Sequence, residues 1–281
     1  MHPYKEGFAE VNNIVLHYIE YENDHPKLVL LHGLTANAFA FNGLIEAGLV
    51  QHFSVISVDQ RGRGLSSKSC ASYRIEDHAL DIIGLLDHLK IKTIHICGHS
   101  FGGLMATYLA FHYPTRFDKI IILDAAPEMN PNTPQMLGST LSRLGKKHKS
   151  FDEFLSKVKD APYIPVWEPA MEAYYKADVE EAEDKSVQSR STILDIVMIS
   201  KAVATVNWEE CFSEMDQSSL FIVALDNYTM AQPLLPIEQA NNILIRMKHC
   251  TYLEVNGNHQ TMLYGKGAQQ IVNAITLFLN S

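Results

Sequence analysis

Cysteine is scarce in this sequence: there are four among 281 residues, and no two of them form a Cys-x-x-Cys pair. Cys70, Cys97, Cys211 and Cys250 are far apart along the chain. Small secreted domains held together by disulfides carry many closely spaced cysteines, and structural zinc sites commonly use paired ones. The sequence therefore favours unpaired thiols in a reducing compartment, and we expect a cytoplasmic protein.

Long apolar runs and an excess of basic residues are also missing. No apolar stretch reaches the roughly 18 residues that a membrane span needs, and residues 1–13 lack the apolar core of a secretion signal. With 23 Lys and Arg against 32 Asp and Glu, the net charge is -9, which argues against nucleic acid as the main partner. We expect neither membrane nor nucleic-acid binding, and the composition leaves a homodimer open.

What the sequence does contain is an alternation of strand-length apolar runs with helical patterns. Hydrophobic residues make up 47% of the chain, which is enough for a large core. The alternation is typical of an α/β fold with a mostly parallel central sheet and helices on both faces. The expected strands are a hairpin over 8–22 around Asn12-Asn13, then 27–33, 53–62, 92–100, 118–127, 219–225 and 250–258, and the expected helices are 73–91, 101–114 and about 267–279.

Residues 128–215 break this alternation. The stretch contains helix-like segments such as 150–160 and 169–185, so we interpret it as a helical cap inserted into the core. The core then consists of residues 1–127 and 216–281.

Aromatic and methionine side chains of the insertion are candidates for the walls of a substrate pocket, because a helical lid supplies apolar surface and excludes water. Trp167, Tyr174 and Met198 are the residues we select. The basic run 143–149 is interpreted as a solvated helix end.

One serine stands between glycines in the stretch "ICGHSFGG", residues 96–103. An apolar strand pattern precedes it and a helical pattern follows it. A nucleophile at such a strand-to-helix turn has a strained backbone, and the residues two positions away must be small, which gives the pattern G-x-S-x-G. Gly98 and Gly102 occupy those positions, so we interpret Ser100 as a nucleophile; the alternative is a glycine-rich turn with an incidental serine.

Three further motifs accompany this turn: "LLHGLTANAFAF" (30–41), "VDQRGRGLSS" (58–67) and "NGNHQTML" (256–263). With "GHSFGG" (98–103), they resemble the oxyanion loop, the D-x-R-G-x-G-x-S loop, the nucleophile elbow and the histidine loop of the α/β-hydrolase fold family. The four motifs stand in the family's order and extend over nearly the whole chain. The resemblance implies the fold, but it does not imply a substrate.

The resemblance also implies where a developing charge would be stabilised. Attack on a carbonyl creates an oxyanion, and two backbone N–H groups usually stabilise it. The family pattern puts these groups at Leu34 and Phe101. In the same pattern His32 is expected to be a structural hydrogen-bonding residue, and Arg61 and Arg63 are expected to anchor a loop.

A general base for Ser100 must lie at the same edge of the sheet. His259 follows the last expected strand on a Gly- and Asn-rich loop, at the carboxyl edge. An imidazole titrates near neutrality, which suits a base. We therefore assign His259 as the base, whereas His99 is expected to point away from the nucleophile and His249 to lie at the wrong edge.

Two aspartates compete for the position that orients this imidazole. Asp124 and Asp226 each end an expected strand at the carboxyl edge. The family more often uses the later strand, with the acid a few residues after a strand-ending glycine that this chain lacks. Asp124 resembles the arrangement in haloalkane dehalogenases and acetamidomethylenesuccinate hydrolase, so we favour Asp124 and keep Asp226 as the runner-up.

These residues predict a serine hydrolase that acts on a small or medium carboxylic ester, lactone or amide through an acyl-enzyme. A carbon–carbon bond hydrolase or a cofactor-free haloperoxidase-like enzyme would use the same triad, and a non-catalytic small-molecule receptor can share the scaffold. The expected partner is a small-molecule substrate. No metal or organic cofactor is expected, because the H-E-x-x-H and G-x-x-x-x-G-K-[ST] patterns do not occur.

Overall fold

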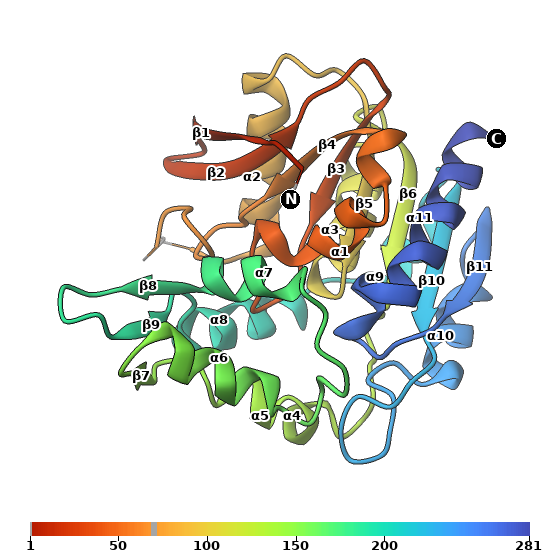
Figure 1. Ribbon diagram of the computed structural model, residues 1–281. Helices are drawn as coiled ribbons and strands as arrows, with labels where there is room; N and C mark the ends of the chain where they lie inside the picture. Colours follow the sequence, from red (N-terminus) through yellow and green to blue (C-terminus); the bar gives the residue numbers. More distant parts are fainter. Residues whose placement is uncertain (1, 69–71) are drawn as a thin grey trace.

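The apolar runs of the sequence assemble into a twisted sheet (Figure 1). The structure, a computed structural model, describes residues 2–68 and 72–281, so Cys70 lies outside the described residues, while Cys97, Cys211 and Cys250 are free thiols. Within the described ranges the sheet has eight strands in the order β1-β2-β4-β3-β5-β6-β10-β11. Their bounds are Lys5–Val11 (β1), Ile14–Tyr21 (β2), Lys27–Leu31 (β3), Ser54–Val58 (β4), Ile94–His99 (β5), Phe117–Leu123 (β6), Ser219–Ala224 (β10) and Cys250–Val255 (β11).

The sheet is antiparallel at one edge and parallel elsewhere, as the sequence predicts. β1 and β2 form a hairpin whose turn residues Asn12 and Asn13 have φ of 47° and 59°, the left-handed conformation that a tight hairpin turn requires. β2 also pairs antiparallel with β4, and the strands from β4 to β11 are parallel. The inner strands β4 and β10 are buried along their whole length, which explains their continuous apolar sequences.

Helices cover both faces of the sheet. One face packs with α2 (Ile75–His88), α3 (Phe101–His112), α9 (Trp208–Glu214) and α10 (Ile237–Leu244), and the other packs with α1 (Asn42–Glu46), the 3₁₀ turn Ala38–Phe41 and α11 (Gly265–Asn280). The two faces carry separate clusters of buried apolar side chains. In this three-layer arrangement α1–α3 and α9–α11 cover the faces of the sheet, so polar side chains can gather at the carboxyl ends of the parallel strands.

The segment between β6 and β10 lies along one end of the sheet (Figure 1, green). Its helices are α4 (Thr133–Met136), α5 (Gly138–Leu141), α6 (Phe151–Lys159), α7 (Met171–Asp178) and α8 (Ile193–Val203), before α9. The segment also contains a small sheet in the order β7-β9-β8, formed by Lys147–His148 (β7), Val179–Glu181 (β8) and Val187–Ser189 (β9). The purely helical expectation therefore missed this sheet.

Two local expectations within this segment were wrong. The helix expected over 169–185 ends at Asp178, because Val179 turns into the extended conformation and pairs with β9. The basic run 143–149 is not a solvated helix end, because Arg143 is buried against Asp178 and Lys147–His148 pair with β9. Tertiary pairing overrides local helix propensity at both places.

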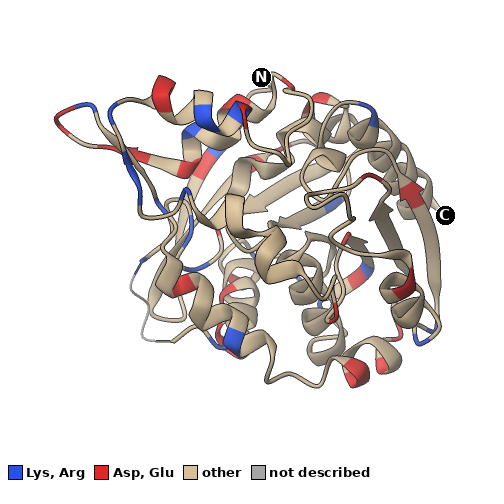
Figure 2. Ribbon diagram, turned by 90° about the horizontal axis from the view of Figure 1, so that it is seen from below, with Lys and Arg blue, Asp and Glu red and all other residues tan. Residues whose placement is uncertain are grey.

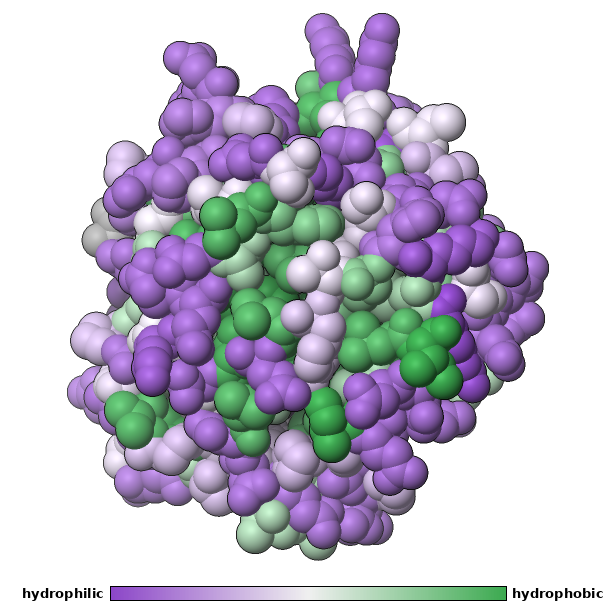
Figure 3. Space-filling view, turned by 90° about the vertical axis from the view of Figure 1, so that its right-hand side faces the viewer, coloured by the Kyte–Doolittle hydropathy of each residue, from purple (hydrophilic) through white to green (hydrophobic). Residues whose placement is uncertain are grey.

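Charges of both signs lie around the periphery of the molecule. Figure 2 shows acidic and basic residues interspersed on the outer elements, while the central strands are mostly tan. On the face in Figure 3, apolar atoms form patches separated by hydrophilic ones. Among the described residues, no helix combines the length and the apolarity that crossing a membrane requires.

Candidate active site

Ser100 lies at a sharp turn between β5 and α3. Its φ of 55° and ψ of -122° fall outside the allowed regions for most side chains and cost about 1–3 kcal/mol. The turn is fixed because the backbone amide of Ser100 donates to the Leu123 carbonyl at 2.9 Å. A Cβ at Gly98 would collide with the carbonyl of Gly102, and one at Gly102 would collide with the carbonyl of Leu31. The two glycines are therefore required by close backbone approach, which is the reason the motif predicts.

His259 and Asp124 meet at the carboxyl edge of the sheet. His259 Nδ1 lies 2.6 Å from Asp124 Oδ2, and both residues are buried. Because a carboxylate only accepts hydrogen bonds, Nδ1 carries the proton and Nε2 is left with a lone pair, the form that a general base needs. The other oxygen of Asp124 accepts from the Ala224 amide at 3.0 Å, so the carboxylate is held from two sides.

Asp226 does not contact His259. Its side chain is exposed and accepts from the Gly257 amide at 3.0 Å, while its own amide donates to the Gly257 carbonyl. The runner-up carboxylate thus holds the loop that carries His259, and the geometry pairs the imidazole with Asp124.

Two other histidines of the motifs are structural. His32 is fully buried, its Nδ1 donates to the Gly33 carbonyl, and its Nε2 accepts from the Gln60 amide. Burial, assisted by the charge of Arg63, lowers the pKa of His32 to about 4. His99 Nε2 lies 2.8 Å from the carbonyl of His259, and burial lowers the pKa of His99 well below its usual value. His99 therefore stays neutral and donates a hydrogen bond to the backbone carbonyl of His259.

The residues expected to provide the oxyanion amides are Leu34 and Phe101, and both line the cavity beside Ser100. Phe101 is the first residue of α3, where backbone N–H groups have no partner within the helix. Arg63 contacts both residues: its Nε donates to the Leu34 carbonyl at 3.0 Å, and its guanidinium lies 5.5 Å from the centre of the Phe101 ring. Arg61 instead makes a bidentate pair with Asp81. Both arginines anchor a loop, as expected.

A cavity of about 250 Å³ opens beside Ser100 and His259. Its walls come from the core loops and from the inserted segment, including Met129, Thr140 and Ser200. Tyr174 lines it as predicted, whereas the other two predicted wall residues do not.

Trp167 and Met198 face elsewhere for simple packing reasons. Trp167 stacks on Tyr175 at 5.8 Å, with the Lys159 ammonium 4.8 Å from its ring centre. Met198 is 38% exposed, because α8 turns Ser200 and Val203 toward the cavity instead. Neither residue is among the described residues that line the cavity.

A match to a family of known proteins agrees with this geometry. The family model described as the alpha/beta hydrolase fold matches residues 26–177, which is more than half of the chain.

The chain belongs to the α/β-hydrolase fold family.

Individual members of the family resemble the chain over part of its sequence. The 3-oxoadipate enol-lactonase 2 of Acinetobacter baylyi is 36% identical over 118 residues, 42% of this chain and 44% of that protein. The 2-(acetamidomethylene)succinate hydrolase of Mesorhizobium japonicum is 33% identical over 119 residues, 42% of each chain. The matched stretch thus spans less than half the length of these curated relatives.

One solved structure extends the likeness to the whole fold. The crystal structure of E-2-(acetamidomethylene)succinate hydrolase superposes with a TM-score of 0.82 over 99% of this chain and 100% of that one, at 18% sequence identity. At this identity the likeness concerns the α/β-hydrolase fold alone.

Sequence reasoning missed a residue that holds the histidine loop. Asn258 is buried, and its Nδ2 donates to the Tyr163 carbonyl at 3.0 Å. Its Oδ1 accepts from the amides of Gln260 and Thr261 at 2.9 Å. Asn258 therefore ties the loop of His259 to the inserted segment. The only local signal was an asparagine next to the histidine.

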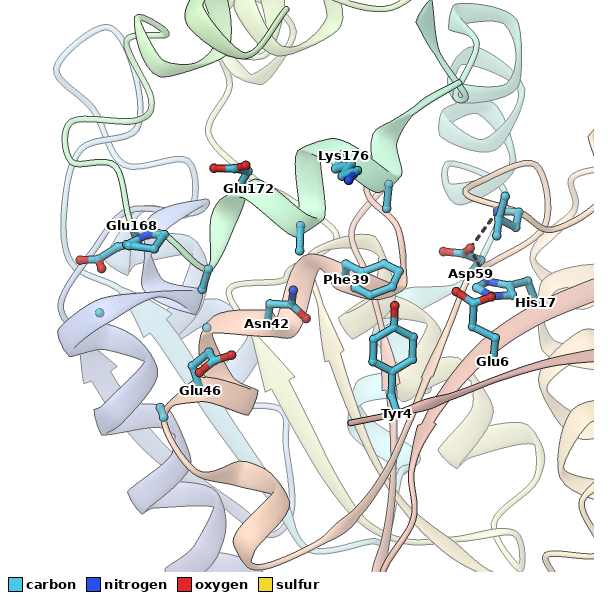
Figure 4. A pocket seen from close by; sticks show the side chains of 18 of the residues that line it. Tyr4, Glu6, His17, Phe39, Asn42, Glu46, Asp59, Glu168, Glu172 and Lys176 are labelled. Atoms are coloured by element: carbon cyan, nitrogen blue, oxygen red, sulfur yellow. Dashed lines mark hydrogen bonds and ion pairs between the residues drawn. The ribbon is translucent and has the colours of Figure 1, made fainter. Parts of the chain in front are cut away.

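A larger hollow, about 1020 Å³, lies away from Ser100, between the N-terminal strands and α7. Figure 4 shows Tyr4, Glu6 and His17 on one side of it and Lys176 on another. His17 Nδ1 is bonded to Asp59 at 2.7 Å, but His17 Nε2 is buried without a hydrogen-bond partner among the described residues. Among the described residues, no cluster of three or more His, Cys, Asp or Glu is arranged to hold a metal ion.

Proposed function

We propose that the protein is a serine hydrolase that cleaves small or medium carboxylic esters, lactones or amides through an acyl-enzyme. The observation that carries the proposal is the 2.6 Å contact between His259 Nδ1 and Asp124 Oδ2, in a cavity that Ser100 also lines. The family and the names of its relatives, an enol-lactonase and a 2-(acetamidomethylene)succinate hydrolase among them, support hydrolysis at a carbonyl carbon.

The proposed reaction has two steps, acylation of Ser100 and hydrolysis of the acyl-enzyme. Ser100 Oγ attacks the carbonyl carbon while His259 Nε2 takes its proton, and the negative oxygen accepts from the Leu34 and Phe101 amides. The tetrahedral intermediate collapses, and the leaving group departs with the proton from His259. Water then attacks the acyl-enzyme by the same route and releases the acid. Asp124 keeps the imidazole in the correct tautomer and stabilises its charged form.

Residues 128–215 serve as the cap in this proposal. Met129, Thr140, Tyr174 and Ser200 come from this segment and complete the cavity wall. The cap thereby limits the size of the acyl or alcohol group and excludes water from the acyl-enzyme.

Labelling with a fluorophosphonate probe, together with hydrolysis of aryl esters of graded acyl length, tests the proposal. Wild-type protein is expected to be labelled and active, and Ser100→Ala is expected to lose both properties with an unchanged melting temperature. Ser213→Ala removes a half-buried serine of α9 outside the cavity and serves as the matched control. Absence of labelling in the wild type, with tight retention of a small ligand, would favour the receptor alternative instead.

A further inference from the structure

The cavity beside Ser100 is notable for its lack of charge. Its walls are built from apolar side chains, hydroxyls, one amide and two histidines. Among the described residues that line it, none is Lys, Arg, Asp or Glu. One of the two histidines, His99, is kept neutral by burial.

Several hydroxyl groups of the walls already form hydrogen bonds with other protein atoms. Ser200 donates to the Ile196 carbonyl at 2.8 Å, Thr133 donates to the Asn130 carbonyl, and Thr140 shares a 2.6 Å hydrogen bond with Tyr228. Ser200 and Thr133 would have to break an internal bond before they donated to an anion, and the Thr140–Tyr228 pair has a single hydroxyl hydrogen left to offer. Away from the Leu34 and Phe101 amides, where the reacting carbonyl binds, the wall therefore offers little to replace the water that a carboxylate loses on entry.

Two buried cations lie behind the wall: Arg63, which donates to the Leu34 carbonyl, and Arg143, whose charge is paired with a carboxylate there. Arg143 donates from Nε to Asp178 at 3.1 Å, from Nη1 to the Thr140 carbonyl at 2.9 Å and from Nη2 to the Thr35 carbonyl at 3.2 Å. Arg143 does not itself line the cavity, whereas Thr140 and Thr35 do. The guanidinium thus stabilises the wall and its own carboxylate partner, and it is not available to a ligand.

We infer that this cavity selects uncharged substrates: neutral esters, lactones or amides, in preference to equally sized molecules that carry a carboxylate. The inference deepens the proposed function and rests on it for the reaction, although the charge selectivity belongs to the cavity itself. Moving an unpaired carboxylate from water into such a wall is unfavourable, because the wall does not replace the lost hydration. A neutral ester of the same length avoids that cost.

Binding to the Ser100→Ala protein tests the selectivity without requiring turnover. Diethyl glutarate is the neutral ligand, and monoethyl glutarate, which is anionic at pH 7.5, is its charged counterpart. Titration calorimetry is expected to give a dissociation constant at least about a hundredfold weaker for the anion, in line with the desolvation of a buried carboxylate. Equal or tighter binding of monoethyl glutarate would overturn the inference, and so would failure of diethyl glutarate to bind.

A charge added at the cavity should reverse part of this preference. Ser200 is exposed and lines the cavity, so a lysine there can reach a bound carboxylate while its ammonium keeps contact with water. In the Ser100→Ala background, Ser200→Lys is expected to lower the ratio of the two dissociation constants, monoethyl over diethyl glutarate, about tenfold. The methionine side chain of Ser200→Met is similar in length to lysine but carries no charge. This variant should leave the ratio of the two dissociation constants unchanged. An equal effect of both substitutions would contradict an electrostatic origin.

Rates with wild-type protein separate this inference from the proposed function. If Ser100→Ala prefers the neutral ester but the wild type hydrolyses neither compound, the proposed reaction is wrong and the selectivity stands. If the wild type hydrolyses monoethyl glutarate with the higher kcat/KM, the reaction stands and the selectivity is wrong.

Discussion

Asp124 and Asp226 differ in how far along the sheet they lie, and this decides which of them reaches the imidazole. In the parallel register Leu123 pairs with Ile222, so Asp124 is level with Val223 and Asp226 lies three residues further. At about 3.3 Å per residue, that is a displacement of roughly 10 Å along the strand. Asp124, which directly follows β6, therefore reaches the imidazole, whereas Asp226 lies two residues beyond the end of β10 and bonds to Gly257 instead.

The residue-scale prediction compares the two carboxylates. Asp124→Asn is expected to lower kcat on the order of 10³- to 10⁴-fold, because an amide no longer selects the tautomer with the proton on Nδ1. Asp226→Asn keeps an oxygen that can accept from the Gly257 amide, so its effect should stay below about tenfold. Steady-state rates with one aryl ester measure both. The reverse ranking would mean that the triad acid has been misassigned.

At the scale of the element, the turn from β5 into α3 requires glycines, because neighbouring atoms lie too close to leave space for a Cβ. Gly98 and Gly102 face each other across the turn, and Gly102 also faces the end of β3. The Cβ of Ala125 would meet a side chain at Gly103. The strained conformation of Ser100 is thus imposed by three strands and one helix packed around it.

The element-scale prediction contrasts two helical glycines. Gly102→Ala is expected to lower the free energy of unfolding by about 2–3 kcal/mol, since the new methyl group meets the Leu31 carbonyl. Gly138→Ala, in α5, meets nothing within 4 Å and should raise stability slightly, by up to about 1 kcal/mol. Urea unfolding followed by circular dichroism gives both values. Equal stability of the two variants would show that the turn can relax.

At the scale of the whole molecule, the core encloses histidines whose burial disfavours the protonated form. Burial lowers the pKa of His32 to about 4, and it lowers the pKa values of His78 and His99 well below their usual range. These residues are neutral in the folded protein, whereas an unfolded histidine takes up a proton near pH 6.5. The unfolded chain therefore binds more protons below that pH, and stability falls as the pH falls from 6.5 toward 4.

The whole-molecule prediction is a loss of up to about 1.4 kcal/mol of unfolding free energy per pH unit for each buried histidine in this window. Both ring nitrogens of His78 are buried without a hydrogen-bond partner in the described part of the chain. His78→Leu should therefore reduce the slope, and the same change at the exposed His52 should not. Urea titrations between pH 7.5 and 4.5 measure the slopes. A slope that His78→Leu leaves unaltered would contradict this account.

Much of the fold follows from local pattern alone. The buried strands, the Asn12-Asn13 hairpin and the glycine-flanked Ser100 each depend on a few consecutive residues, because side-chain periodicity and allowed backbone angles act over short distances. The location in the cytoplasm and a homodimer stay predictions, since composition alone bears on them.

The sequence by itself determined the order of strands and helices, the serine turn and the loop that carries His259, all of which depend on neighbours in the chain. Tertiary structure alone decided that His259 pairs with Asp124, that Asn258 joins its loop to the inserted segment, and that Trp167 and Met198 turn away from the cavity. These outcomes depend on strand register and on packing between residues far apart in sequence. A single chain's residue pattern does not encode such distances in any local form.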